Sequence, residues 1–514
     1  MNFFSKTWKQ DLPAGLVVFL VAVPLCLGIA LASEAPVFSG LIAGIIGGVV
    51  VGIFSGSAIG VSGPAAGLAA IVATALHDFQ SLYTNPFEVF LSAVVLAGLI
   101  QLIFGVVRLG IISSFFPNAV IKGMLSAIGL LIVFKQFPHA VGYDADFEGD
   151  EAFFQSDGHN TFSEIIYSLN YISIAAVIIF CVSMVLLLVW DTKRIQTTLL
   201  RFIPGPLVVV LVGILLTLGM EGSSIALSID HRVNLGIEGK SLMQLMTFPD
   251  FTHVLSSKVV IVAITIAIVA SVETLLSVDA ADKLDPLKRT TNGNRELFAQ
   301  GIGNVFSGFI GGLPITQVVV RSSANVNAGG VSKGATIVHG LLIAVTCLTI
   351  PFVFSYVPFA SLAAILVLVG YKLAKPSIFK TVYKASKKEF FIFAVTIIAI
   401  LLTDLLKGIM LGMLISFLII LFHANKVNRQ NFFKKAYQIK RNNNGLELFF
   451  LENVTFLSKT AIQKILAKIK PNTTFTINKS RTHYFSADIN ELIVDFQKTA
   501  ESRQITLIFI DKKL

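Results

Sequence analysis

Apolar runs, each close to the length that crosses a lipid bilayer, follow one another along most of the chain. A hydrocarbon core of about 30 Å requires roughly 20 apolar residues in helical conformation. Runs of this kind lie near residues 14–31, 37–54, 87–106, 119–136, 170–189, 204–219, 258–280, 296–311, 335–356, 359–373, 389–404 and 408–423. The pattern predicts a polytopic α-helical membrane protein.

Two further apolar segments, at about 61–76 and 313–328, are interrupted by glycine and proline. Glycine tolerates extended or strained backbone, and proline suits the first turn of a helix. Each segment is therefore predicted to be an extended stretch followed by a half-length helix. The alternative is that the Gly-Pro pairs only kink two ordinary spans.

The charged connections indicate how the chain is threaded. Lys and Arg gather in the connections at 193–201, 282–295 and 372–388, whereas the stretch 143–164 is acidic. If both interrupted segments cross, every basic connection falls on the cytoplasmic side, as membrane proteins prefer. This gives about 14 spans in a multi-pass protein of the plasma (inner) membrane, with both termini cytoplasmic.

Each interrupted segment is the third crossing in a half of about seven spans. An odd number of spans per half makes the two halves, at about 11–220 and 255–425, inverted relative to each other. The two half-helices then enter from opposite faces, and their N-termini meet near the bilayer midplane. Each N-terminus carries roughly half a positive charge and unpaired N–H donors, so the pair predicts a site for a small anion.

After Lys426 the sequence becomes polar, with short alternating runs at 446–451, 474–478 and 505–510. Helix-period stretches at about 458–469 and 487–502 separate these runs. The segment 427–514 is therefore predicted to be a small α/β cytoplasmic domain behind a transport domain of residues 1–425.

Composition narrows the function. Of the 514 residues 54% are hydrophobic and 14% charged, which excludes an ordinary soluble enzyme. The net charge of +10 is explained by cytoplasmic loops rather than by nucleic acid. Three scattered cysteines exclude a disulfide framework, and no metalloprotease or nucleophile-elbow motif is present, so we expect no enzyme and no cofactor.

Glu273 is the ionisable residue of greatest interest, because it lies about 22 Å along the run that follows Lys258. Ser277 is one turn further on the same face, so the two side chains are candidates to hold a coupling cation, Na⁺ or H⁺. A structural role in helix packing is the alternative for Glu273. Arg321 is expected either to attract the anion or to snorkel to the surface, and His339 to be packed and hydrogen-bonded.

Ser62, Thr316 and Gln317 flank the predicted half-helix starts. Ser62 is a candidate N-cap, and Gln317 is a candidate donor to the anion.

Four stretches resemble the SulP family of anion transporters, the bacterial relatives of solute carrier family 26. They are VSGPAAG (61–67), SVETLLSVDAADKL (271–284), NRELFAQGIGNVFSGFIGGLP (294–314) and Arg321. The resemblance implies a core-and-gate fold of two inverted seven-span repeats, an elevator-like movement, a homodimer, and a C-terminal STAS-like domain that could bind a cytoplasmic partner.

The resemblance also implies a binding site. The implied substrate-binding positions, at the half-helix starts, are Ala65, Ala66, Gly67, Thr316, Gln317 and Val318. The acidic residue of the eighth span falls on Glu273 and its hydroxyl partner on Ser277. Family members coupled to Na⁺ typically carry Asp and Thr there, so Na⁺ and H⁺ both stay open.

The substrate is expected to be a small inorganic anion, and bicarbonate carried by symport with Na⁺ or H⁺ is preferred. Paired helix N-termini supply about one positive charge, which suits a monovalent anion better than sulfate. Sulfate or dicarboxylate symport with protons is the alternative, because Arg321 could supply further charge. An anion channel or exchanger is a separate class that the sequence leaves open.

Overall fold

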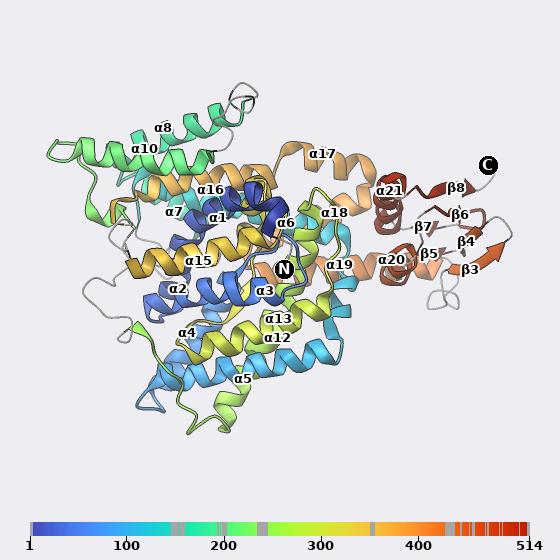
Figure 1. The fold of residues 1–514 in the computed structure, drawn as a ribbon, viewed down its shortest axis with the longest axis horizontal. Coiled ribbons are helices and arrows are strands. Elements are labelled where there is room, and N and C mark those ends of the chain that lie inside the picture. Colours follow the sequence, from blue (N-terminus) through green and yellow to red (C-terminus); the bar gives the residue numbers. More distant parts are fainter. Residues whose placement is uncertain are drawn as a thin grey trace. The chain divides into compact units, whose positions relative to one another are not determined.

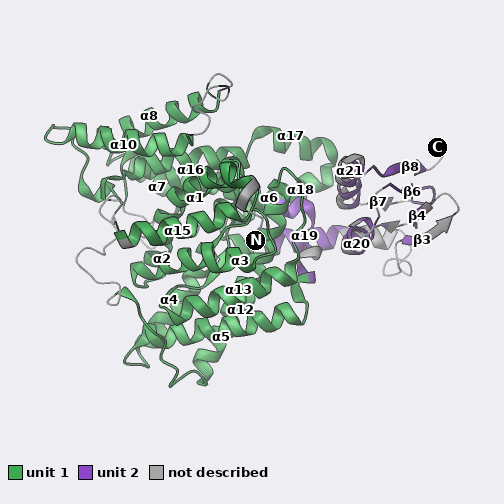
Figure 2. Cartoon of the chain, in the orientation of Figure 1, with its two compact units in different colours: residues 1–110, 122–410 green, residues 111–121, 411–514 purple. Residues whose placement is uncertain are grey.

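The structure is a computed structural model whose described residues divide into two compact units, shown in Figure 2. Unit 1 is residues 1–110 and 122–410, and unit 2 is residues 111–121 and 411–514. The structure describes the chain except residues 1–3, 145–152, 154–159, 193, 194, 196, 198–202, 234–244, 350–354, 427–436, 443, 444, 452, 455–457, 468, 470, 471, 483, 486, 503 and 511–514. Most of the basic connection 193–201 and most of the acidic stretch 143–164 lie outside the described residues. The domain boundary at residues 425–427 stays a prediction.

The described part of unit 1 is mainly helical and contains two short strands (Figure 1). Its first half contains α1 (Phe4–Ala32), α2 (Val37–Ile46) continued by a π-helical turn (Gly47–Val51) and α3 (Gly52–Phe54), β1 (Ser62–Pro64), α4 (Ala66–Gln80), α5 (Pro86–Val106), α6 (Asn118–Val141), α7 (Thr161–Ser168), α8 (Ile174–Trp190) and α10 (Gly205–Met220). Its second half contains α12 (Ser257–Leu284), α13 (Gly293–Phe309), β2 (Ile315–Gln317), α14 (Val319–Asn327), α15 (Gly334–Thr349), α16 (Phe359–Leu373), α17 (Pro376–Ala385), α18 (Lys387–Leu402) and the first residues of α19 (Leu405–Lys426). The chain passes from unit 2 to unit 1 within α6, and from unit 1 to unit 2 within α19.

Every apolar run singled out in the sequence overlaps one or more of these helices, although residues 350–354 of the run 335–356 lie outside the described residues. Six described helical stretches have both the length and the hydropathy to cross a bilayer, and they are Thr7–Ala32, Val37–Phe54, Pro86–Val106, Asn118–Val141, Ser257–Leu284 and Phe359–Ala385. The polytopic helical fold class is therefore confirmed, while the count of about 14 spans stays a prediction.

Glycines allow α5 and α13, which lie side by side in Figure 1, to pack closely. A Cβ on Gly301 of α13 would lie 2.7 Å from the backbone nitrogen of Leu102 and 2.8 Å from the carbonyl of Gly98, both in α5. Small residues at such contacts let helix backbones approach and gain van der Waals contact in a lipid environment. The glycine-rich run of α13 thus fixes this helix against α5.

A carboxylate that bonds two histidines connects the end of α6 to the segment between α10 and α12. Asp144 accepts hydrogen bonds from Nδ1 of His139 at 2.5 Å and from Nδ1 of His231 at 2.6 Å. Burial by itself raises the pKa of Asp144, but the bonds from both histidines outweigh it and lower that pKa below its usual range. The hydrogen bond to Asp144 raises the pKa of His231 despite partial burial, which favours an ion pair.

Unit 2 contains a small α/β fold. Its elements are β3 (Tyr437–Asn442), β4 (Gly445–Phe450), β5 (Asn453–Val454), α20 (Lys459–Ala467), β6 (Thr474–Asn478), β7 (Tyr484–Phe485), α21 (Ala487–Ser502) and β8 (Thr506–Ile510). The main sheet has the order β3-β4-β6-β8, in which only the β3–β4 pair is antiparallel. Alternate apolar residues of β4 and β6 form a core with both helices. The β/α pattern predicted for a STAS-like segment is confirmed at this level.

Candidate functional site

The two interrupted segments are each a short strand followed by a short helix. β1 precedes α4, which has 15 residues, and β2 precedes α14, which has 9 residues. At 1.5 Å per residue these helices measure about 22 and 14 Å, less than the roughly 30 Å of a bilayer core. The prediction of an extended stretch followed by a half-helix is confirmed, and the kinked-span alternative is wrong.

The two strands pair with each other, although they lie about 250 residues apart. The ladder is antiparallel, with Ser62 opposite Gln317, Gly63 opposite Thr316 and Pro64 opposite Ile315. The chain therefore leaves β1 and β2 in opposite directions, and α4 and α14 begin at opposite ends of the ladder. Both helix N-termini point towards a ladder only about 7 Å long, where their unpaired N–H groups and partial charges combine.

The helix starts differ slightly from those the resemblance implies. Ala65 is the N-cap of α4, with Ala66 and Gly67 in its first turn, whereas Val318 is the N-cap of α14. Thr316 and Gln317 lie in β2 rather than in the first helical turn. Neither N-cap uses a side chain, because alanine and valine carry no side-chain acceptor for the first-turn N–H groups.

Ser62 is wrongly predicted to be an N-cap. It lies in β1, and its hydroxyl accepts a hydrogen bond of 2.7 Å from the side-chain amide of Gln300 in α13. Gln317 in β2 is held by α12. Its backbone N–H donates to Thr274 Oγ1 at 3.3 Å, and its side chain donates to the Ser277 carbonyl at 3.4 Å.

Arg321 is the largest fully buried side chain of the described chain, so the snorkelling alternative is wrong. Its Nη2 donates to Sγ of Cys26 in α1 at 3.3 Å. Its Nε and Nη1 meet no hydrogen-bond partner among the described residues. A Cβ added to Gly63 would stand 2.9 Å from the guanidinium carbon, so the cation lies directly against β1. A buried guanidinium with free donors suits an incoming anion.

Glu273 lies in α12, and its carboxylate lies beside Gly67 at the start of α4. A Cβ on Gly67 would be 3.2 Å from both carboxylate oxygens, so the carboxylate lies against the first turn of that helix. Glu273 and Ser277 are both buried, one turn apart on α12. The structure thus brings the predicted acidic residue and the predicted anion-binding backbone together.

His339 in α15 is fully buried, as the sequence leads us to expect. The expectation of hydrogen bonds is wrong for the described part of the chain, because neither ring nitrogen has a partner there.

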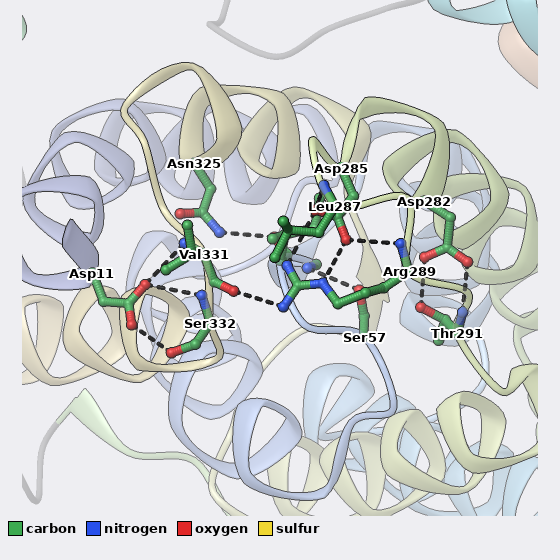
Figure 3. Close-up of polar contacts among 12 residues, drawn as sticks. Asp11, Ser57, Asp282, Asp285, Leu287, Arg289, Thr291, Asn325, Val331 and Ser332 are labelled. Atoms are coloured by element: carbon green, nitrogen blue, oxygen red, sulfur yellow. Dashed lines mark hydrogen bonds and ion pairs between the residues drawn. The ribbon is translucent and has the colours of Figure 1, made fainter. Parts of the chain in front are cut away.

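Outside the β1–β2 ladder, polar contacts connect α1 and the loops that follow α12 and α14 (Figure 3). Asp11 of α1 accepts hydrogen bonds from the backbone N–H groups of Val331 and Ser332 at 3.0 and 2.9 Å. Arg289 donates to the Val331 carbonyl at 2.8 Å and to Asp285 at 2.7 Å. Burial raises the pKa of Asp285, but hydrogen bonds from Arg289 and the Leu287 N–H lower it overall. The Asp285 carboxylate therefore stays ionised and holds Arg289, which in turn bonds the loop after α14 at Val331.

A row of buried polar side chains on α13 was missed by the sequence analysis. Its members are Glu296, Gln300, Asn304 and Ser307, all fully buried. Spacings of four, four and three residues place them on one helix face, and this periodicity in a glycine-rich helix is the signal that could have identified them. Cys26 was missed because nothing in its apolar surroundings indicates a neighbouring cation.

The family model described as the sulfate permease family matches residues 8–396. The chain belongs to the sulfate permease family. Members of this family are membrane transporters rather than enzymes, so the predicted membership, the membrane location and the absence of enzymatic function are confirmed.

Among curated members of the family, the putative sulfate transporter YvdB of Bacillus subtilis is 26% identical over 498 residues, covering 95% of this chain and 88% of the relative. The bicarbonate transporter BicA of Picosynechococcus is 23% identical over 411 residues, covering 79% of this chain and 69% of the relative. The relatives thus include proteins named for two different anions.

Two solved structures share the fold. The transmembrane domain of a cyanobacterial bicarbonate transporter BicA superposes with a TM-score of 0.55 at 21% identity, covering 80% of this chain and 98% of that chain. The structure of SLC26A9 superposes with a TM-score of 0.58 at 18% identity, covering 97% of this chain and 84% of that chain. These similarities establish the fold of a sulfate permease family member.

Proposed function

We propose that this protein is a secondary active transporter of small inorganic anions across the plasma membrane. The observation that carries the proposal is the antiparallel β1–β2 ladder, from which two half-helices depart beside the buried, incompletely bonded Arg321. The anion binds at Ser62, Ala65, Ala66, Gly67, Thr316, Gln317, Val318 and Arg321. An elevator-like movement of the elements around the ladder exposes this site to each side in turn, in a homodimer.

The charges near the ladder favour a monovalent anion. Two helix N-termini contribute about one positive charge together, Arg321 contributes one, and ionised Glu273 removes one, which leaves a sum of about +1. Bicarbonate matches this sum.

A cation bound beside Glu273 and Ser277, or a proton on Glu273, raises the sum to about +2. That charge suits sulfate or a dicarboxylate, the second candidate class, and ties its binding to symport. The choice of substrate and the choice of coupling ion are therefore linked through one carboxylate.

Uptake by proteoliposomes tests the function. Labelled bicarbonate and labelled sulfate are offered separately, with and without an inward gradient of Na⁺ or H⁺. A coupled carrier accumulates the anion above its outside concentration, whereas a channel only equilibrates it. Equilibration without accumulation under every gradient would reject secondary active transport in favour of the channel alternative.

Glu273→Gln tests the coupling site. We expect this variant to lose the cation dependence of uptake, since the neutral amide lacks the negative charge that attracts a cation and cannot carry the proton. Glu34→Gln, at an exposed position, is the matched control and keeps that dependence. Cation dependence that survives in Glu273→Gln would exclude Glu273 as the coupling residue.

A further inference from the structure

The β1–β2 ladder is too short for its two strands to bond all of their own backbone N–H and C=O groups, and side chains of α13 supply further hydrogen bonds. The N–H of Val318 donates to the Val61 carbonyl at 2.9 Å, so these facing residues are a pair joined across the ladder by one hydrogen bond, while the Val61 N–H donates to Ser322 Oγ at 3.0 Å. In an antiparallel ladder such pairs alternate with pairs whose N–H and C=O groups point outwards. The register therefore turns the backbone groups of Ile315 away from β1. Buried backbone groups of this kind need another partner.

Asn304 provides that partner for Ile315. Its Oδ1 accepts from the Ile315 N–H at 2.6 Å, and its Nδ2 donates to the Ile315 carbonyl at 3.0 Å. One side-chain amide thus bonds both backbone groups of the same residue, as a neighbouring β-strand would. Nδ2 also donates to Oε1 of Gln101 at 2.6 Å, which fixes the orientation of the amide.

The same face of α13 holds both interrupted segments. Glu296 accepts from the Ser55 hydroxyl at 2.6 Å and from the Gly56 N–H at 2.9 Å, both shortly before β1. Gln300 bonds Ser62 within β1, and Ser307 donates to the Leu313 carbonyl at 2.7 Å just before β2. Residues from two segments far apart in the sequence are thus fixed against one rigid helix.

We propose that the polar face of α13, and Asn304 above all, positions the two half-helix N-termini for the anion. Asn304 is a positioning residue: it acts through the Ile315 backbone, and its own amide is fully occupied by the ladder and Gln101. The proposal rests on the proposed anion transport, and it adds that affinity depends on a residue outside the binding site. Because Asn304 is neutral, it sets the distance between the helix ends without changing the charge of the site.

Asn304→Ala is the decisive variant, and Phe306→Ala, a half-exposed side chain of the same helix, is its control. We expect the KM for anion uptake to rise about tenfold in Asn304→Ala, as the loss of buried hydrogen bonds implies, with the maximal rate per folded protein nearly unchanged. Phe306→Ala keeps the KM of the unmodified protein. A merely structural role would instead lower the amount of folded transporter and leave its KM unchanged, and that result would overturn the proposal.

Gln101→Ala provides a second variant if Asn304→Ala does not fold. It leaves Asn304 in place but removes the acceptor that orients its amide, and a smaller increase in KM, about threefold, is expected. An unchanged KM in this variant would also count against the proposal.

Hydrogen–deuterium exchange separates this proposal from the proposed function. The peptide 311–319 is expected to exchange faster in Asn304→Ala than in Phe306→Ala, because the Ile315 N–H loses its acceptor. If the unmodified protein transports neither anion, the proposed function fails while exchange still reports on positioning. If transport is normal and exchange is equal in both variants, the positioning role fails alone.

Discussion

Gly63→Ala tests whether Arg321 contacts the transported anion. The new Cβ would stand 2.9 Å from the guanidinium carbon and closer still to Nη1. Because carbon atoms prefer a separation of about 3.5–4.0 Å, the guanidinium must retreat by roughly 1 Å. Its charge is retained, so the variant changes distance alone.

The expected loss follows from Coulomb's law. With an effective dielectric constant of about 20, moving a cation from about 4 to about 5 Å from an anion weakens the attraction from about 4.2 to about 3.3 kcal/mol. The difference of about 0.8 kcal/mol corresponds to an approximately fourfold weaker affinity.

Initial rates of anion uptake, measured over a range of anion concentrations in proteoliposomes, give the KM that checks this value. Gly219→Ala is the control, because a Cβ there meets no atom within 4 Å. An unchanged KM in Gly63→Ala, with equal amounts of folded protein, would show that Arg321 does not face the anion.

The remaining predictions concern the carboxylate beside α4 and the histidine–carboxylate cluster. Gly67→Ala places a Cβ 3.2 Å from the Glu273 carboxylate, so we expect a severalfold higher cation concentration for half-maximal uptake, and an equal concentration would contradict this contact. The lowered pKa of Asp144 stabilises the fold above its ordinary value of 3.8, and this contribution is lost as pH falls through the lowered pKa. The raised pKa of His231 stabilises the fold below the ordinary value of 6.5, and this contribution is lost as pH rises through the raised pKa. The melting temperature is therefore expected to decrease as pH rises above 6.5. In His231→Gln this decrease should be smaller, whereas in His77→Gln, at an exposed position, it should be unchanged. A pH dependence in His231→Gln identical to that of the unmodified protein would refute the role of the histidine–carboxylate cluster.

The sequence by itself determined the helices and the breaks between them. Runs of about 20 apolar residues leave few alternatives in lipid, because every backbone group must be bonded internally. Glycine and proline at 60–64 and 311–314 interrupt such runs, and this local pattern is enough to mark both half-helices. Glu273 stood out for a similar reason, since an ionisable residue within a span requires a function or a partner.

Only the tertiary structure decided how the site is assembled. The pairing of Ser62 with Gln317 joins residues whose neighbours in sequence say nothing of each other. Arg321 is buried because α1, β1 and α14 converge on it, a burial that depends on packing rather than on local pattern. Asn304 looks like an ordinary polar residue until the outward backbone of Ile315 lies beside it. Local sequence fixes backbone conformation within a few residues, whereas the partners of a buried polar group are chosen by the three-dimensional arrangement that excludes water from it.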